Sequence, residues 1–119
     1  MHSLEQEDTP RNLIVGELVA LFAAGKFEDA LRRAPRSRVT AEQLRGAVNA
    51  YGRSLVALPA EGYELIDCVE VRGSNPTEWS VVVPLFTREE GRSDLSLELS
   101  MFEGAAGSYS VEIDDIHVL

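Results

Sequence analysis

The spacing of apolar residues changes once along this 119-residue chain, and that change constrains the fold more than any other feature. Between Pro10 and Leu58, apolar side chains recur at intervals of three and four residues, the period of amphipathic helices. From Tyr63 onward the period is two, which is typical of half-buried strands. Helices followed by strands predict an α+β fold, with N-terminal helices packed on a curved antiparallel β-sheet of about four strands.

Capping residues divide the first part of the chain into helices. Thr9, before Pro10, is expected to cap the first helix, and Gly25 to end it. Thr40 and Gln43 have the spacing of a capping box, which predicts another helix start. The predicted helices span residues 10–24, 27–33 and 41–58.

Turn residues divide the second part into four strands, although two positions break the alternation. Pro84 lies inside the second strand, so that strand is expected to be an edge strand or to contain a bulge. In the last strand, the apolar positions are odd-numbered before Asp114 and even-numbered after Asp115. One extra residue there predicts a β-bulge at Asp114–Asp115. The predicted strands span residues 65–71, 79–85, 95–101 and 109–118.

Length and composition indicate a single domain over residues 9–119, preceded by a flexible tail over residues 1–8. Hydrophobic residues make up 45% of the chain, enough for a core without metals or disulfides. Cys68 is the single cysteine, and no apolar run approaches the roughly 20 residues of a membrane helix. We therefore expect a cytoplasmic protein that neither crosses a membrane nor carries a cofactor.

Charge is distributed unevenly along the chain. Residues 1–58 hold eight Lys/Arg and seven Asp/Glu, a balance of +1, whereas residues 59–119 hold three Lys/Arg and thirteen Asp/Glu, a balance of −10. The predicted sheet therefore carries the excess that gives the chain its net charge of −9. Such a surface disfavours nucleic acid and attracts cationic partners, although high net charge also serves solubility alone.

The order of elements resembles the cone-shaped α+β fold of nuclear transport factor 2-like and cystatin-like proteins. Residues 23–30 (Ala-Ala-Gly-Lys-Phe-Glu-Asp-Ala) end the first helix as is common in that superfamily. Residues 90–95 (Glu-Gly-Arg-Ser-Asp-Leu) and 113–119 (Ile-Asp-Asp-Ile-His-Val-Leu) are similar to the signature of a small bacterial domain family of unknown function. The resemblance implies that, if this chain were one of the enzymes of that superfamily, it would keep an Asp or His inside the cone. No residue of this chain matches such a motif, so no catalytic residue is assigned.

The outward positions of the last two predicted strands form the main candidate site. The hairpin is expected to bring Glu98 near Glu112 or Asp114, and like charges across strands are destabilising unless solvated or neutralised. Arg92 either pairs with a neighbouring acid and stabilises the bulge or belongs to a recognition loop. The candidate partner-binding residues are Asp94, Glu98, Glu112, Asp114, Asp115 and Arg92.

Other candidates each have a structural alternative. His117, close to two aspartates, is a possible acid/base, or it forms a structural hydrogen bond to an acid or to the 88–93 turn. Cys68 is interpreted as a buried small residue. Asp67 and Glu70 are possible acids of a pocket between sheet and helices. No metal site is assigned, because no calcium-loop spacing is present.

These patterns lead to three hypotheses. The first is a non-enzymatic acidic protein-binding module, immunity- or antitoxin-like, that binds a basic partner through its sheet face. The second is a small-molecule-binding or lyase/isomerase-type cone-fold protein. The third is a homodimeric scaffold, in which arginines of the helical part pair with the acidic face of a second copy. Those arginines are Arg32, Arg33, Arg36, Arg38, Arg45 and Arg53.

Overall fold

The computed structural model describes residues 9–118, so the expected tail over residues 1–8 lies outside the described residues. The helices are α2 (Pro10–Ala23), α3 (Phe27–Arg33), α4 (Ala41–Tyr51) and α5 (Ala60–Tyr63). The strands are β1 (Asp67–Val71), β2 (Glu78–Thr87), β3 (Gly91–Glu103) and β4 (Tyr109–Val118), with a short 3-10 turn, η1 (Ala105–Gly107), in the last hairpin. None of the described helices is long and apolar enough to cross a membrane.

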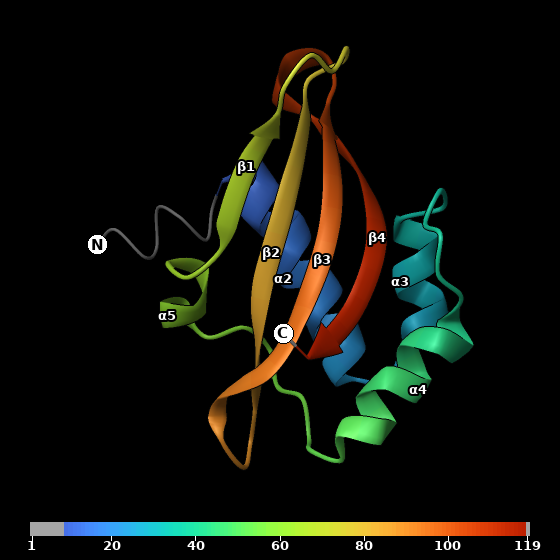
Figure 1. Ribbon diagram of the computed structural model, residues 1–119, viewed down its shortest axis with the longest axis vertical. Helices are drawn as coiled ribbons and strands as arrows, with labels where there is room; N and C mark the ends of the chain where they lie inside the picture. The colour runs from blue at the N-terminus through green and yellow to red at the C-terminus, as the bar shows by residue number, and fades with distance from the viewer. Residues whose placement is uncertain (1–8, 119) are drawn as a thin grey trace.

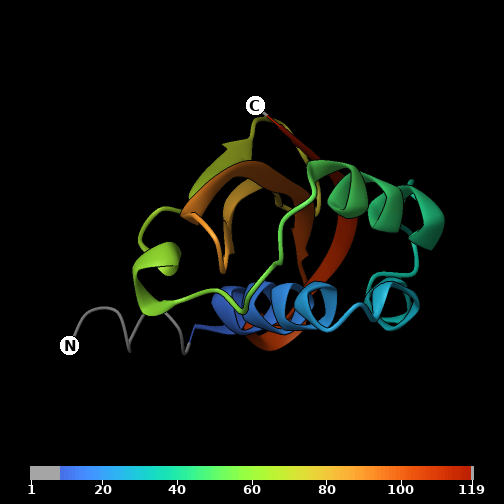
Figure 2. The same ribbon diagram turned by 90° about the horizontal axis from the view of Figure 1, so that it is seen from below.

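The strands form one antiparallel sheet in the order β1-β2-β3-β4 (Figure 1). Helix α2 crosses one face of the sheet, α5 lies near β1, and α3 and α4 lie beside β4. Seen from below, the sheet curves over α2 (Figure 2). N-terminal helices packed on a four-stranded antiparallel sheet confirm the α+β prediction.

The core lies between α2 and the inner face of the sheet. The α2 side chains Val15, Leu18 and Val19 are fully buried, and Phe22 is 2% exposed. Apolar strand residues at alternate positions face them, because successive side chains of a strand point to opposite faces. All six residues expected on the inner face are buried: Leu95, Leu97, Leu99, Met101, Val111 and Ile113.

The predicted helix starts are confirmed by their hydrogen bonds. Thr9 Oγ1 accepts from the Asn12 N–H at 3.2 Å. The Thr40 and Gln43 side chains each accept from the other's backbone N–H, at 3.1 and 2.9 Å, which completes the capping box. These contacts satisfy N–H groups that have no partner within the helix.

Helix α4 ends seven residues earlier than its apolar pattern predicts, at Tyr51 rather than Leu58. Gly52 adopts a left-handed conformation (φ 76°), which ends the helix. Leu55 and Leu58 are still buried, but they lie in an irregular segment that follows the helix. The prediction was wrong because apolar residues of an irregular segment happened to continue the helical spacing.

The irregularity expected at Pro84 is a register shift within an internal strand, so β2 is not an edge strand. Between the pairs Pro84↔Ser96 and Phe86↔Arg92, one residue of β2 faces three residues of β3. The buried Ser93 hydroxyl donates to the Leu85 carbonyl at 2.8 Å and accepts from the Leu95 N–H at 3.1 Å. A side chain thus replaces ladder hydrogen bonds that the shift removes.

We expect Ser93→Ala to lower the free energy of unfolding by about 1–3 kcal/mol, because it leaves two buried backbone groups without this partner. Ser96→Ala is the matched control: Ser96 is 4% exposed, and its hydroxyl makes no hydrogen bond with residues 9–118. Urea unfolding of both variants measures the difference. Equal losses would show that the Ser93 hydroxyl does not support the shifted register.

Two helical glycines should respond oppositely to alanine. A Cβ at Gly16 would overlap the Tyr63 hydroxyl oxygen, whereas a Cβ at Gly46 would meet nothing within 4 Å. Gly46→Ala should stabilise by about 0.5–1 kcal/mol through helix propensity. Gly16→Ala should instead destabilise by about 1 kcal/mol or more, since the Tyr63 ring must move. Thermal unfolding tests both, and a Gly16→Ala variant as stable as Gly46→Ala would contradict this account.

Candidate functional site

The sheet face opposite α2 carries no described helix (Figure 1). The four strands hold nine Asp/Glu and one Arg, with no Lys. Six of these acids lie on or beside the outward face, in register across the sheet or at the β4 bulge. We call them the acidic face: Asp67, Glu78, Glu98, Glu112, Asp114 and Asp115.

The predicted bulge in β4 is confirmed and arranges the centre of this face. Glu98 pairs with Asp115 while Leu99 pairs with Ile113, so Asp114 is the extra residue. The Ser100 hydroxyl donates to Asp114 at 2.7 Å, which holds this carboxylate on the same side as Asp115. Glu98 was expected near Glu112 or Asp114; the bulge makes Asp115 its direct partner and places Asp114 next to that partner along β4.

His117 lies between two acids of this face. Its Nδ1 is 3.0 Å from Asp115 Oδ2, and its Nε2 is 3.2 Å from Glu98 Oε2. The predicted hydrogen bond to an acid is therefore confirmed, with both ring nitrogens directed at carboxylates. A neutral imidazole has one N–H donor, so only the protonated ring satisfies both contacts. In that state His117 offsets part of the repulsion between Glu98 and Asp115.

Arg92 and Asp94 lie beyond the centre of the acidic face, at the beginning of β3. Together with Pro84, Ser93 and Ser96 they line a surface groove of about 290 Å³. The expected pairing of Arg92 with Asp94, Asp114 or Asp115 was wrong: it makes no ion pair with residues 9–118. The recognition-loop alternative for Arg92 stays a prediction.

Asp67 and Glu70 are not acids of an enclosed pocket, because both are exposed on β1. Asp67 lies in register with Val82, across the sheet from Glu98, and so belongs to the acidic face. Glu70 lines a surface groove of about 340 Å³ with Arg72 and Gly73. The side chains between α2 and the sheet form the hydrophobic core, so the pocket hypothesis gains no support.

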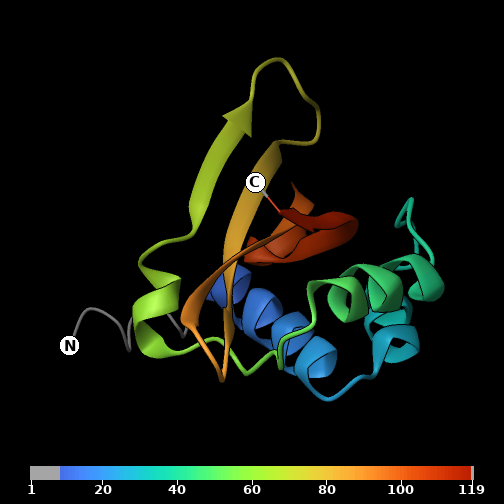
Figure 3. The ribbon, with the colours of Figure 1, turned by 60° about the horizontal axis from the view of Figure 1, so that its bottom comes forward.

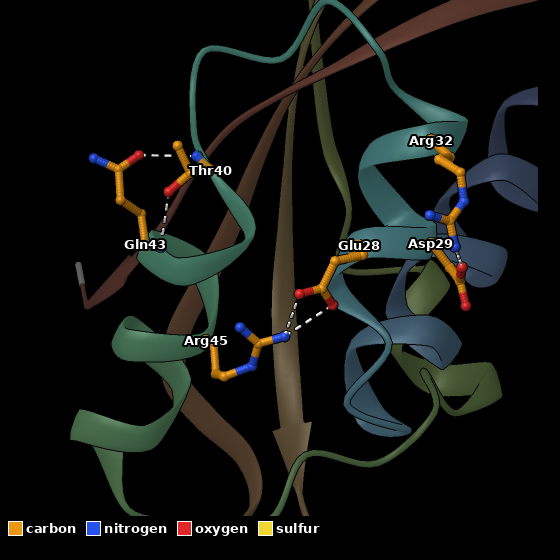
Figure 4. A network of polar contacts seen from close by, with 6 residues as sticks. All are labelled: Glu28, Asp29, Arg32, Thr40, Gln43 and Arg45. Carbon is orange, nitrogen blue, oxygen red and sulfur yellow. Dashed lines mark hydrogen bonds and ion pairs between the residues drawn. The ribbon is translucent and has the colours of Figure 1, made fainter.

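Helical arginines form ion pairs with acids of their own helix or a neighbouring helix. Arg45 binds the Glu28 carboxylate at 2.8 Å, which lowers the pKa of Glu28, and Arg32 pairs with Asp29 (Figure 4). A third pair joins Arg33 to Glu17 at 3.0 Å. These contacts leave Arg36, Arg38 and Arg53 without an ion pair among residues 9–118.

One contact near the site has no local sequence signal. The Tyr51 hydroxyl at the end of α4 donates to the Glu90 carboxylate at 2.9 Å and accepts from the Asp94 N–H at 3.1 Å. It thereby holds the β2–β3 turn against α4. Tyr51 also lines a groove of about 400 Å³ between α4 and the end of β4, together with Ala47, Ala50, Leu95, Ile116, His117 and Val118.

Cys68 is half-buried, and the Arg11 guanidinium donates to its sulfur at 3.5 Å. Burial raises the pKa of the Cys68 thiol, and the Arg11 charge opposes this only in part. Because the thiolate is the nucleophile, a raised pKa makes the group less reactive. Cys68 was expected to be a buried small residue; it is half-buried and packs against the core.

We therefore expect the native protein to react with a disulfide reagent at pH 8 several-fold more slowly than the same chain in urea. Arg11→Gln should slow the native reaction further, because it removes the charge that favours the thiolate. Cys68 is the single cysteine, so the release of thiolate chromophore reports this residue alone. A native rate equal to that of the unfolded chain would contradict the prediction.

Fold and site together define an α+β domain whose sheet is covered by helices on one face and is acidic on the other. Residues 19–119 match the model of a domain of unknown function, DUF7668, and the chain belongs to this family. The comparison with curated proteins and that with solved structures each found no match. The expected membership of a family of unknown function is thereby confirmed. Residues 9–118 contain no group of three His, Cys, Asp or Glu side chains placed to hold a metal ion.

Proposed function

We propose that this protein is a non-enzymatic binding module whose acidic face docks a basic protein, in the manner of an immunity protein or antitoxin in a bacterial cytoplasm. The observation that carries the proposal is the composition of the sheet: nine acids and one arginine in its strands. Six of these acids lie on the face that no described helix covers.

The electrostatics of this face favour a cationic partner. Glu98 lies opposite Asp115, and like charges directly opposite each other across strands are destabilising. Within the acidic face, His117 contacts only Glu98 and Asp115, and Glu112 makes no hydrogen bond or ion pair with residues 9–118. A partner that brings lysines or arginines relieves the remaining repulsion. Long-range attraction to such a face also raises association rates, by about 10- to 1000-fold at low salt.

Pairing of two copies through this face is disfavoured, because it would bring twelve acids together. The remaining dimer hypothesis places helical arginines on the acidic face of a second copy. Three of the six arginines already pair within the chain, which weakens that arrangement. A basic partner of different sequence therefore fits the surface better than a second copy.

A fluorescein-labelled deca-arginine peptide tests the location of binding by fluorescence anisotropy at 50 mM NaCl. The triple variant Glu98→Gln, Glu112→Gln, Asp114→Asn should weaken its binding at least tenfold, because it removes the centre of the acidic face. The matched control is Glu42→Gln, Glu61→Gln, Glu64→Gln, three exposed acids outside the strands and outside the acidic face. This control changes net charge equally and should weaken binding less than threefold.

Wild-type binding should also weaken steeply between 50 and 200 mM NaCl, as screening of exposed charges requires. Equal losses in the two triple variants would show that net charge, not the acidic face, determines binding. An affinity unchanged by the first triple variant would overturn the proposed function. Circular dichroism of each variant establishes that the fold is intact.

A further inference from the structure

The two edges of the sheet differ in how their backbone groups are covered. At the β4 edge, the Ile113 N–H donates to the Ser37 hydroxyl at 2.8 Å, and α4 packs against the strand. At the other edge, β1 pairs only with β2, and no described segment lies against its outer side (Figure 3). An uncovered edge strand presents unpaired N–H and C=O groups that can pair with another chain.

The hydrogen bonds of β2 identify which β1 groups are free. Thr77 O accepts from the Glu103 N–H, and Leu85 O accepts from Ser93 Oγ, so odd-numbered residues of this segment direct backbone groups toward β3. Even-numbered residues of β2 therefore bond β1, through the pairs Val82↔Asp67, Ser80↔Val69 and Glu78↔Val71. Backbone groups alternate in direction along an antiparallel strand. The N–H and C=O groups of Cys68 and Glu70 thus point to the open edge.

The side chains along this edge indicate the charge of a partner. Asp67 and Glu70 are exposed, the strand contains no Lys or Arg, and Val69 is 57% exposed. Asp67 is also the acidic-face residue on the edge strand, so a strand added beside β1 would extend that face. Lysines or arginines opposite Asp67 and Glu70 would complement both positions.

We propose that an extended basic segment of the partner pairs with β1 as a fifth strand, bonded through the main chain to Cys68 and Glu70. The inference rests on the proposed function and adds the form in which the partner binds. Strand addition of this kind derives affinity from main-chain hydrogen bonds and specificity from alternate side chains.

Two other occupants of the edge fit less well. Residues 1–8 contain three acids and no Lys or Arg, so these residues and β1 both carry negative charge and repel each other. A second copy paired through β1 would place two chains of net charge −9 side by side and join their acidic faces. Both arrangements add negative charge where the edge already has an excess.

The test uses a labelled peptide with the sequence Thr-Val-Lys-Val-Thr-Lys-Val. Run antiparallel to β1, its two lysines face Glu70 and Asp67, and its central valine faces Val69. The matched peptide is N-methylated at the first lysine and the second threonine, the residues opposite Glu70 and Cys68. It keeps every side chain and charge but loses the two N–H groups that would bond the edge. We expect anisotropy to show saturable binding of the first peptide and at least tenfold weaker binding of the second.

Protein variants test the same contact from the other side. Glu70→Pro removes an N–H that faces the edge and leaves the β2 ladder intact, as proline is tolerated at such positions. It should weaken peptide binding at least tenfold, whereas Glu70→Gln, which keeps the N–H, should weaken it less than threefold. Should Glu70→Pro fail to fold, the N-methylated peptide decides alone.

The outcomes separate this inference from the proposed function. Equal binding of the two peptides would overturn strand addition. Strand addition would also be overturned if the peptide does not bind while deca-arginine still distinguishes the two triple variants. That result would leave the acidic face supported as a binding surface. Loss of binding with Glu70→Pro and the methylated peptide supports the inference even if deca-arginine fails to distinguish the triple variants. Sedimentation measures the oligomeric state. A wild-type dimer that Glu70→Pro abolishes would show that a second copy occupies the edge, and this would overturn the proposal.

Discussion

Burial of one stripe of α2 against the inner face of the sheet is the contact on which the other features depend. Val15, Leu18, Val19 and Phe22 on α2 are almost wholly inaccessible to solvent, and burying such side chains contributes about 1.5–3 kcal/mol each. The sheet residues that meet them occupy every second position of their strands. The intervening polar positions must then point the other way, so the same alternation that makes the core also gathers the acids on one surface.

Much of this arrangement follows from local signals in the amino-acid sequence. The caps at Thr9 and Thr40, the alternation in β3 and the parity change at Asp114 each depend on a few neighbouring residues, and all were confirmed. The predicted end of α4 was too late, because the apolar pattern continues past Gly52, whereas the left-handed conformation of Gly52 ends the helix there. Capping residues therefore predict where a helix begins better than the spacing of apolar residues predicts where it ends.

The sequence predicted the acidic composition of the candidate site and four of its six acids, but not the two that β1 and the start of β2 contribute. The excess of acid in the second half of the chain predicted a negatively charged sheet. Asp67 was instead assigned to a pocket, because its place depends on β1 pairing with β2 across a turn that includes Gly73. Tyr51 and Glu90 are 39 residues apart, and no periodic pattern reports such a contact. Pairing at long range is decided by the whole fold.

The bulge in β4 has a consequence for how densely charge can be placed. A regular strand presents a side chain to one face only every second residue, at intervals of about 6.6 Å. The extra residue at Asp114 lets two successive carboxylates occupy the same face, and Glu98 of the neighbouring strand lies directly opposite Asp115. Three acids therefore crowd into a space that regular pairing would give to two. A single inserted residue in the strand thus raises the local density of negative charge on the open side of the sheet.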